Sequence, residues 1–323
     1  MNKISVCLAT FNEEKNIRDC LESVKWADEI VIVDGTSSDK TVEIASSIGR
    51  SASGQKKPKI KIIVRENPLM FHINKQKAFE AASGDWILYL DADERVTPKL
   101  RDEILKVINH QSSVTSHQYN GFWIPRKNII FGKWIKHTGW YPDHQLRLFK
   151  RGRAYLPCQS VHEQPKLSGK AGYLKNPLLH YNYQTVSQFI RKLNILYTEN
   201  DKNVFLAEGK KIKWQDAIRF PFNEFLKRFF KEKGYKDGLH GLVLSILQAF
   251  SIFVTFAKIW ETQNFEVASS PTGGKKFLEK IEKELGQTKR ELRYWFLTNR
   301  INEENSFFPK VILKIKRRLG RIL

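Results

Sequence analysis

The sequence predicts an α/β fold with a mainly parallel central sheet flanked by helices, followed by a C-terminal α-helical extension. In the first hundred residues, short β-branched runs alternate with amphipathic stretches of helical period. This alternation is typical of βαβ units joined by right-handed crossovers. From about residue 186 to the end, helical periodicity prevails, which predicts the extension.

The predicted elements of the N-terminal region follow one another at short intervals. Strands are expected at residues 4–9, 29–34, 60–64 and 86–91. Helices are expected at residues 13–23, 39–47, 73–82 and 98–108. Because ligands of such sheets bind beyond the carboxyl ends of the strands, the residues that follow each strand are the first candidates for chemistry.

The charge of the chain is unevenly distributed. Its 323 residues include 55 lysines and arginines against 34 acidic residues, a net charge of +21. Residues 1–100 are neutral, residues 101–200 carry +10 and residues 201–323 carry +11. This asymmetry indicates a neutral N-terminal unit fused to parts that face an anionic partner. Three widely spaced cysteines indicate a reducing compartment, and the apolar run that ends at Phe11 is too short for a secretory signal.

Acidic and hydroxyl residues gather where three predicted strands end. The segments are Ala9-Thr10-Phe11-Asn12-Glu13-Glu14, Val33-Asp34-Gly35-Thr36-Ser37-Ser38-Asp39 and Leu90-Asp91-Ala92-Asp93-Glu94. Asp91 and Asp93 can both face one hard divalent cation that bridges phosphates. The same segment also suits a turn in which Asp93 or Thr97 caps the next helix. Because no strand is followed by Gly-x-Gly-x-x-Gly or a P-loop, a dinucleotide enzyme or P-loop ATPase is disfavoured.

These segments and Ala81-Ala82-Ser83-Gly84-Asp85-Trp86 resemble the N-terminal signatures of family 2 glycosyltransferases, which adopt the GT-A fold. The stretches Tyr141-Pro142-Asp143-His144-Gln145-Leu146-Arg147-Leu148-Phe149 and Val161-His162-Glu163 resemble the branch with the bacterial lipopolysaccharide core β-1,4-glucosyltransferases. Residues 228–242 resemble the C-terminal helical region of that branch. The resemblance covers about residues 1–262.

The resemblance implies an inverting transferase with a nucleotide-sugar donor, UDP-glucose being expected, and Mg2+ or Mn2+ as cofactor. Residues implied to bind the donor are Thr10, Asn12 and Glu14 at the base and ribose, Asp34 at the base or ribose, Asp91 at the ribose and diphosphate, and Gln76 or Lys75 on a helix. Asp93 would ligate the metal, with His162 as the best-placed later ligand. His162 also suits a hydrogen-bonded core histidine.

An inverting transfer needs a general base that takes a proton from the acceptor hydroxyl. Asp143 and Glu163 stand out in the acid-poor middle third of the chain. We predict Asp143 as the base, with Glu163 as the alternative. Either carboxylate also suits an ordinary ion pair, Asp143 with Arg147 or Arg126 and Glu163 with a nearby lysine.

Four regions are therefore expected along the chain. Residues 1–110 and 111–185 would form the nucleotide-sugar-binding and acceptor-binding halves of a GT-A domain. Residues 186–262 would form a helical region, and residues 263–323 a charged helical tail. The expected acceptor is a phosphorylated lipid-linked saccharide such as the lipopolysaccharide inner core, which places the enzyme peripherally on the inner face of the bacterial cytoplasmic membrane.

Two helical segments suggest contact with an anionic membrane surface. Residues 238–257 lack charges and are long enough to cross a bilayer, but Gly241, Ser245, Gln248 and Thr255 share one narrow stripe. This segment could lie in the membrane interface or a dimer contact, pack as a core helix, or span the membrane. Residues 310–323 form a basic amphipathic helix with Ile312, Ile315, Leu319 and Ile322 on one side.

Two other functions stay open. A polyprenyl-phosphate glycosyltransferase would share the N-terminal half, and its ionised acceptor would need no strong base. A non-catalytic nucleic-acid-binding protein could use the basic and aromatic side chains of the middle third, although nucleic acid is the less favoured partner. The sequence also leaves a homo-oligomer open.

Overall fold

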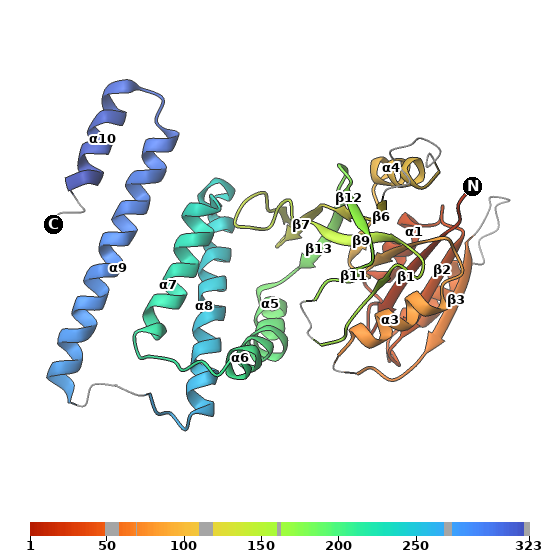
Figure 1. Cartoon of the computed structure of the whole chain (residues 1–323), viewed down its shortest axis with the longest axis horizontal. Coiled ribbons are helices and arrows are strands. Elements are labelled where there is room, and N and C mark those ends of the chain that lie inside the picture. The colour runs from red at the N-terminus through yellow and green to blue at the C-terminus, as the bar shows by residue number, and fades with distance from the viewer. Residues whose placement is uncertain (49–57, 69, 110–118, 160–162, 268–272, 320–323) are drawn as a thin grey trace. The chain divides into compact units, whose positions relative to one another are not determined.

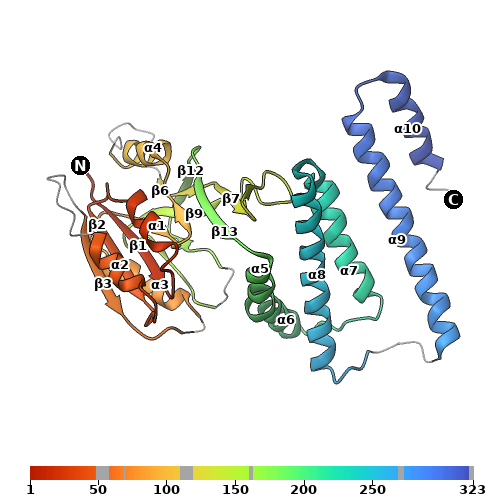
Figure 2. The same cartoon turned by 180° about the vertical axis from the view of Figure 1, so that it is seen from behind.

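The computed structural model describes residues 1–48, 58–68, 70–109, 119–159, 163–267 and 273–319 (Figure 1). The chain divides into two compact units. The first comprises Met1–Trp134 and Trp140–Gln184, and the second comprises Ile135–Gly139 and Thr185–Leu323. The first unit is an α/β structure and the second is helical (Figures 1 and 2).

A seven-stranded sheet of order β12-β6-β9-β4-β1-β2-β3 forms the centre of the first unit. Its strands are β1 (Ile4–Thr10), β2 (Glu29–Asp34), β3 (Lys59–Val64), β4 (Trp86–Leu90), β6 (Tyr119–Ile124), β9 (Gln145–Lys150) and β12 (Lys170–Tyr173). Strands β1 to β4 pair in parallel, β9 runs antiparallel to β4 and β6, and β12 is parallel to β6. This mainly parallel sheet with one reversed strand confirms the predicted fold class.

Helices cover both faces of the sheet, as Figures 1 and 2 show from opposite sides. The helices α1 (Ile17–Ser23), α2 (Thr41–Ile48) and α4 (Pro98–Asn109) pack on the face that carries Val6 and Leu8. On the other face, α3 (His72–Ala81) packs Phe79 against Cys7 and Phe149. Successive strand residues alternate between the faces, so β-branched runs with both faces covered are buried throughout.

A smaller sheet of order β5-β13-β7-β8 extends the first unit. Its strands are β5 (Glu94–Arg95), β7 (Arg126–Ile130), β8 (Lys133–Trp134) and β13 (Leu178–Tyr183), and β10 (Ala154–Tyr155) with β11 (Lys166–Leu167) forms a separate ribbon. Strand β5 directly follows the turn that contains Asp91 and Asp93. Its antiparallel pairing with β13 sets His180 opposite Glu94, next to that turn.

The predicted bounds of the N-terminal elements agree with the structure to within two residues, except at the first helix. That helix starts at Ile17 rather than residue 13. The residues of its expected first turn bond to residues 39 and 41 instead. Glu13 N donates to Thr41 Oγ1 over 2.7 Å, and Glu14 N donates to Asp39 Oδ2 over 3.1 Å. Thr97 caps α4, since its Oγ1 accepts a hydrogen bond from Leu100 N at 3.2 Å.

Most of the described part of the second unit is helical. Its helices are α5 (Val186–Lys192), η1 (Leu193–Tyr197), α6 (Thr198–Ala207), α7 (Asp216–Leu226), η2 (Lys227–Lys231), η3 (Gly234–Asp237), α8 (Leu239–Thr262), α9 (Gly274–Glu303) and α10 (Phe307–Leu319). Asp237 fastens residues 135–139 to this unit, because its carboxylate accepts hydrogen bonds from His137 N at 2.8 Å and Lys136 N at 3.3 Å.

Among the described residues, α8 is the one helix long and apolar enough to cross a membrane by length and composition. Gly241 and Ser245 of its predicted polar stripe are buried, while Ile246, Phe250 and Phe253 are exposed. The first part of the polar stripe is therefore packed inside the unit, whereas an apolar side of α8 is exposed. α8 is therefore not a fully buried core helix, and its contact with a membrane or a second copy stays a prediction.

Candidate functional site

The carboxyl ends of β1 and β2 are joined through the carboxylate of Asp34. Thr10 Oγ1 donates to Asp34 Oδ1 over 2.9 Å. Ser37 donates from its backbone N over 2.8 Å to Oδ2 and from its Oγ over 2.7 Å to Oδ1. Asp34 is almost completely buried. The two residues predicted to meet the base and ribose are thus brought together, with Asp34 as the acceptor that shapes the loop.

Asn12 and Glu14, which are also predicted to bind the donor, connect the loop after β1 to the loop after β2 through hydrogen bonds. Asn12 adopts a positive φ of 55°, and its Oδ1 accepts a hydrogen bond from Ser38 N at 2.9 Å. Glu14 Oε2 accepts one from Lys40 N at 3.3 Å. Both side chains stabilise the loop pair at the edge where the sequence predicts the nucleotide.

Asp91, at the end of β4, lies between two buried cations. Lys75 Nζ is 2.6 Å from Asp91 Oδ1, and Arg147 Nη2 is 2.6 Å from Asp91 Oδ2. The aromatic ring of Tyr89 lies beneath both cations, 4.9 Å from Lys75 Nζ and 4.1 Å from Arg147 Cζ. Burial alone would raise the pKa of Asp91, but the two cations outweigh it and hold that pKa well below its ordinary value.

The ion pairs continue from Asp91 to the predicted base. Arg147 Nη2 is also 2.8 Å from Oε1 of the fully buried Glu94. The same oxygen lies 3.3 Å from Arg126 Nη1, and Arg126 Nη2 lies 2.7 Å from Asp143 Oδ2. With Lys75, three cations and three carboxylates alternate along one network. Because its charges balance, the network can stay largely buried between the end of β4 and Asp143.

Asp143 accepts hydrogen bonds at both carboxylate oxygens. Its Oδ2 accepts from Arg126 Nε at 2.9 Å and from Asn128 Nδ2 at 2.9 Å, and its Oδ1 accepts from Gln145 Nε2 at 2.8 Å. Burial would raise the pKa of Asp143, but Arg126 and the hydrogen bonds outweigh it and lower that pKa. Of the two ion pairs weighed for Asp143, the structure contains the one with Arg126. Asp143 is therefore an ionised and oriented carboxylate.

Asp93 lies beside a histidine that sequence reasoning did not select. His180 Nε2 is 3.5 Å from Asp93 Oδ1. Asn128 Nδ2 donates to Asp143 and to the carbonyl oxygen of Trp140, so Asn128 Oδ1 is the atom that accepts, and it lies 2.7 Å from His180 Nδ1. His180 Nδ1 therefore carries a proton. In the neutral ring the lone pair of Nε2 then faces the Asp93 carboxylate, an arrangement that a cation between the two would stabilise.

Gln76 and Glu163 hold the loop after β10. Gln76 Oε1 accepts a hydrogen bond from Leu156 N at 2.9 Å. Glu163 accepts hydrogen bonds from Cys158 N and, at 3.1 Å, from Gln159 N. Glu163 Oε1 also lies 3.3 Å from Nδ1 of the buried His72, and within the described residues no lysine forms an ion pair with Glu163. Through these bonds Gln76 and Glu163 position the backbone of the loop after β10. The predicted metal ligand His162 lies outside the described residues.

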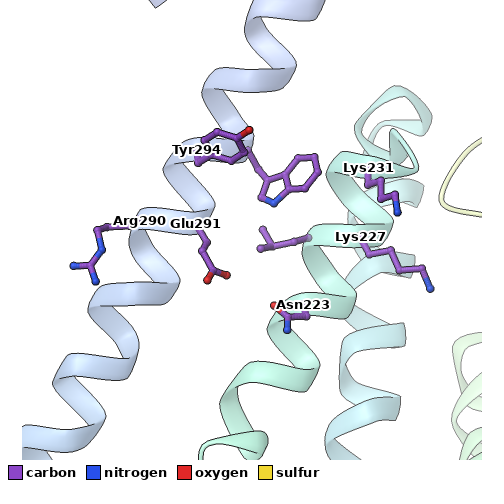
Figure 3. Close-up of a pocket in the computed structure, with 8 residues that line it drawn as sticks. Asn223, Lys227, Lys231, Arg290, Glu291 and Tyr294 are labelled. Carbon is purple, nitrogen blue, oxygen red and sulfur yellow. The ribbon is translucent and has the colours of Figure 1, made fainter. Parts of the chain in front are cut away.

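An open groove of about 480 Å³ lies between α7–η2 and α9 in the second unit. Figure 3 shows Glu291 between the helices, whereas Lys227, Lys231 and Arg290 extend away from the groove. No residue of the predicted site lines it. Because its cations do not converge, the groove lacks the charge arrangement of an anion site.

The residues that sequence reasoning missed are mainly the partners of predicted carboxylates. Arg147 and His180 each stand in a strand among apolar or aromatic neighbours, which is an unusual place for a polar side chain without a buried partner. This strand pattern was the available signal. The pattern does not identify the partner of Arg147, since Arg147 and Asp91 are far apart in the chain and meet only through the pairing of β4 with β9.

The mainly parallel sheet and its acidic carboxyl edge are the arrangement expected of a glycosyltransferase with the GT-A fold. Residues 5–164 match Glycosyl transferase family 2, so the chain contains a domain of this family. Over 273 residues, it is 29% identical to "Uncharacterized glycosyltransferase RT0209" of Rickettsia typhi, covering 81% of this chain and 88% of the relative.

A second relative and a solved structure are similar over most of the chain. The "Lipopolysaccharide core biosynthesis glycosyltransferase LpsC" of Rhizobium meliloti is 27% identical over 273 residues, covering 80% of this chain and 92% of the relative. The solved mannosyltransferase PcManGT from Pyrobaculum calidifontis, in complex with GDP-Man and Mn2+, is 13% identical with a TM-score of 0.44. That similarity covers 88% of this chain and 80% of the mannosyltransferase.

Proposed function

We propose that this glycosyltransferase moves a hexose, with UDP-glucose as the expected donor, to a phosphorylated lipid-linked saccharide such as the lipopolysaccharide inner core, with inversion at the sugar carbon. The similarity to LpsC, a lipopolysaccharide core biosynthesis glycosyltransferase, supports the acceptor class. The observation that carries the chemistry is the Asp93–His180 pair beside Asp91 at the carboxyl end of β4. Such an acceptor places the reaction at the inner face of the cytoplasmic membrane.

Asp93 and His180 are the residues that would hold Mg2+ or Mn2+. Among the described residues no group of three His, Cys, Asp or Glu side chains could hold a metal. Two protein ligands suffice here, because Mg2+ commonly binds through one or two carboxylates, substrate phosphates and waters. When bound, the cation would stabilise negative charge on the leaving diphosphate.

Asp91 and Asp143 have different parts in the proposed reaction. Lys75 and Arg147 keep Asp91 ionised and hold both of its oxygens in place. Asp91 would therefore contact the donor from a fixed position and would not ligate the metal. Asp143 would take the proton from the acceptor hydroxyl. Asn128 contacts both Asp143 and His180, so the proposed base and the proposed metal ligand would belong to one hydrogen-bonded group.

The test measures transfer and hydrolysis of UDP-glucose by the full-length protein with Mn2+ or Mg2+. Asp93→Asn should lower turnover by about 100-fold or more, on the scale of losing one electrostatic contact to the transition state. His180→Gln should raise the metal concentration needed for half-maximal rate. Asp102→Asn, on the exposed surface of α4, is the matched control and should behave like the wild type.

Melting temperatures test the proposed nucleotide-sugar donor separately from the proposed metal site. Across a panel of nucleotide sugars, only a true donor should raise the melting temperature in a metal-dependent way. Full turnover in Asp93→Asn would refute the metal site while leaving the transferase intact. If no nucleotide sugar stabilised the wild-type protein, the proposed function itself would be wrong.

A further inference from the structure

Helix α10 packs on α9 through one side only. Leu313 is buried, Arg317 Nη1 donates to Thr298 Oγ1 over 3.2 Å, and the Arg317 guanidinium lies 5.6 Å from the centre of the Tyr294 ring. Figures 1 and 2 both show α10 folded back along α9. These contacts fix which side of α10 faces the protein.

The opposite side of α10 is an exposed apolar arc. At about 100° per residue its members fall on one side of the helix, away from Leu313 and Arg317. The arc consists of Phe308, Val311, Ile312, Ile315 and Leu319. Phe308 is 78% exposed and Ile315 is 54% exposed. An ordinary surface helix turns such residues toward the core, and this one turns them away from it.

Cations border the apolar arc on both edges. Lys314 and Arg318 lie along one edge and Lys316 along the other, and all three are exposed. From residue 305 to the end, the chain contains no Asp or Glu. The apolar arc and its bordering cations are complementary to a surface that has anionic groups on the outside and an apolar layer directly beneath them.

We propose that α10 lies in the interface of an anionic phospholipid bilayer, with its apolar arc at the headgroup and acyl boundary and its cations on lipid phosphates. Each basic residue close to such a surface contributes to binding, and the apolar arc adds contact area. A second copy of this chain is a poorer occupant. A symmetric contact would set the same cationic edges against each other in a protein of net charge +21.

This inference does not rest on the proposed transferase function, because membrane binding is measured without any substrate. It concerns a surface of the second unit that shares no residue with the site at the carboxyl ends of β1, β2 and β4. A helix lying on the bilayer would keep the enzyme on the surface where a lipid-linked acceptor is found.

The experiment is co-sedimentation of the full-length protein with phosphatidylcholine vesicles, with and without phosphatidylglycerol. The wild type should bind the mixed vesicles, bind the neutral vesicles far more weakly, and dissociate as salt rises. Replacing Lys314, Lys316 and Arg318 with Gln should weaken binding to the mixed vesicles roughly 100-fold. The matched control replaces Lys3, Lys99 and Lys175 of the first unit with Gln, removes the same charge and should bind like the wild type.

A second variant tests the apolar arc at constant charge. Replacing Ile312, Ile315 and Leu319 with Gln should lower binding at least tenfold and leave the melting temperature within a few degrees of the wild type, because these side chains are exposed. Equal binding of the wild type to neutral and mixed vesicles would overturn the proposal. So would unchanged binding of both variants, or a wild-type dimer in solution that the arc variant dissociates.

Discussion

Arg147 Nη2 lies 2.6 Å from Asp91 Oδ2, and with the same nitrogen it reaches Glu94 Oε1 at 2.8 Å. Arg147 and Glu94 are buried, so each charge depends on its partner rather than on water. One arginine of β9 therefore ties the end of β4 to β5. This pairing fixes the turn that carries Asp93.

Arg147→Met should destabilise the fold by about 3–5 kcal/mol, because it leaves the fully buried Glu94 and the partly buried Asp91 with fewer cations. The free energy of unfolding in urea measures this effect. Arg147→Lys keeps a charge but not the guanidinium fork, and should fall between Met and the wild type. Arg153→Met, at an exposed arginine, is the control. A loss below about 1 kcal/mol for Arg147→Met would show that the network does not depend on this residue.

The pH profile of activity depends on the ion pair between Arg126 and Asp143. A general base acts in its ionised form, and the pKa of Asp143 is lowered, so the acidic limb of kcat/KM should lie below the ordinary aspartate value of about 3.9. Arg126→Met removes the cation and should move that limb to higher pH. Arg101→Met, at an exposed surface pair, should leave the limb in place. A limb that does not move would argue against Asp143 as the base.

The same pair links pH to stability. Because the pKa of Asp143 is lower in the folded chain than in the unfolded chain, the pair stabilises the fold above about pH 4. That contribution is lost as the pH falls through the lowered folded value. Arg126→Met should therefore unfold more easily than the wild type near neutral pH, with the difference shrinking toward strong acid.

Substitution of the two candidate bases separates the open mechanisms. Asp143→Asn should lower kcat by about 100-fold or more with donor binding retained, since the amide keeps the shape but cannot accept the proton. Glu163→Gln should keep most of kcat. The reverse result would identify Glu163 as the base. Full activity of both variants would favour a lipid-phosphate acceptor that is already ionised.

The sequence was informative where local pattern decides structure. The short apolar runs of β1, β2 and β4 are covered on both faces and favour a strand, and the carboxyl ends of these parallel strands must meet at one edge of the sheet. The partners of Asp91 could not be assigned in this way, and for Asp143 the sequence left Arg147 and Arg126 as alternatives. They depend on strand order, since β9 inserts beside β4 in reversed direction, and no local pattern encodes that choice.

The loop that Glu163 holds offers a local test. Glu163→Ala removes the acceptor for Cys158 N and Gln159 N, so both amides should exchange hydrogen at least tenfold faster. Global stability should fall by only about 1–2 kcal/mol, because the loop lies outside the main core. Glu80→Ala, on exposed α3 surface, is the control. Unchanged exchange at both amides would mean that Glu163 does not hold this loop.

Gly241 and Gly286 make a matched pair within helices of the second unit. A Cβ at Gly241 would overlap the carbonyl oxygen of Gly234, whereas a Cβ at Gly286 would meet nothing within 4 Å. Gly241→Ala should therefore destabilise the protein by about 1–3 kcal/mol through overpacking of α8 on η3. Gly286→Ala should stabilise it by about 0.5–1 kcal/mol, because alanine loses less backbone entropy in a helix. Thermal unfolding measures both, and equal shifts for the two variants would contradict the close approach of α8 to Gly234.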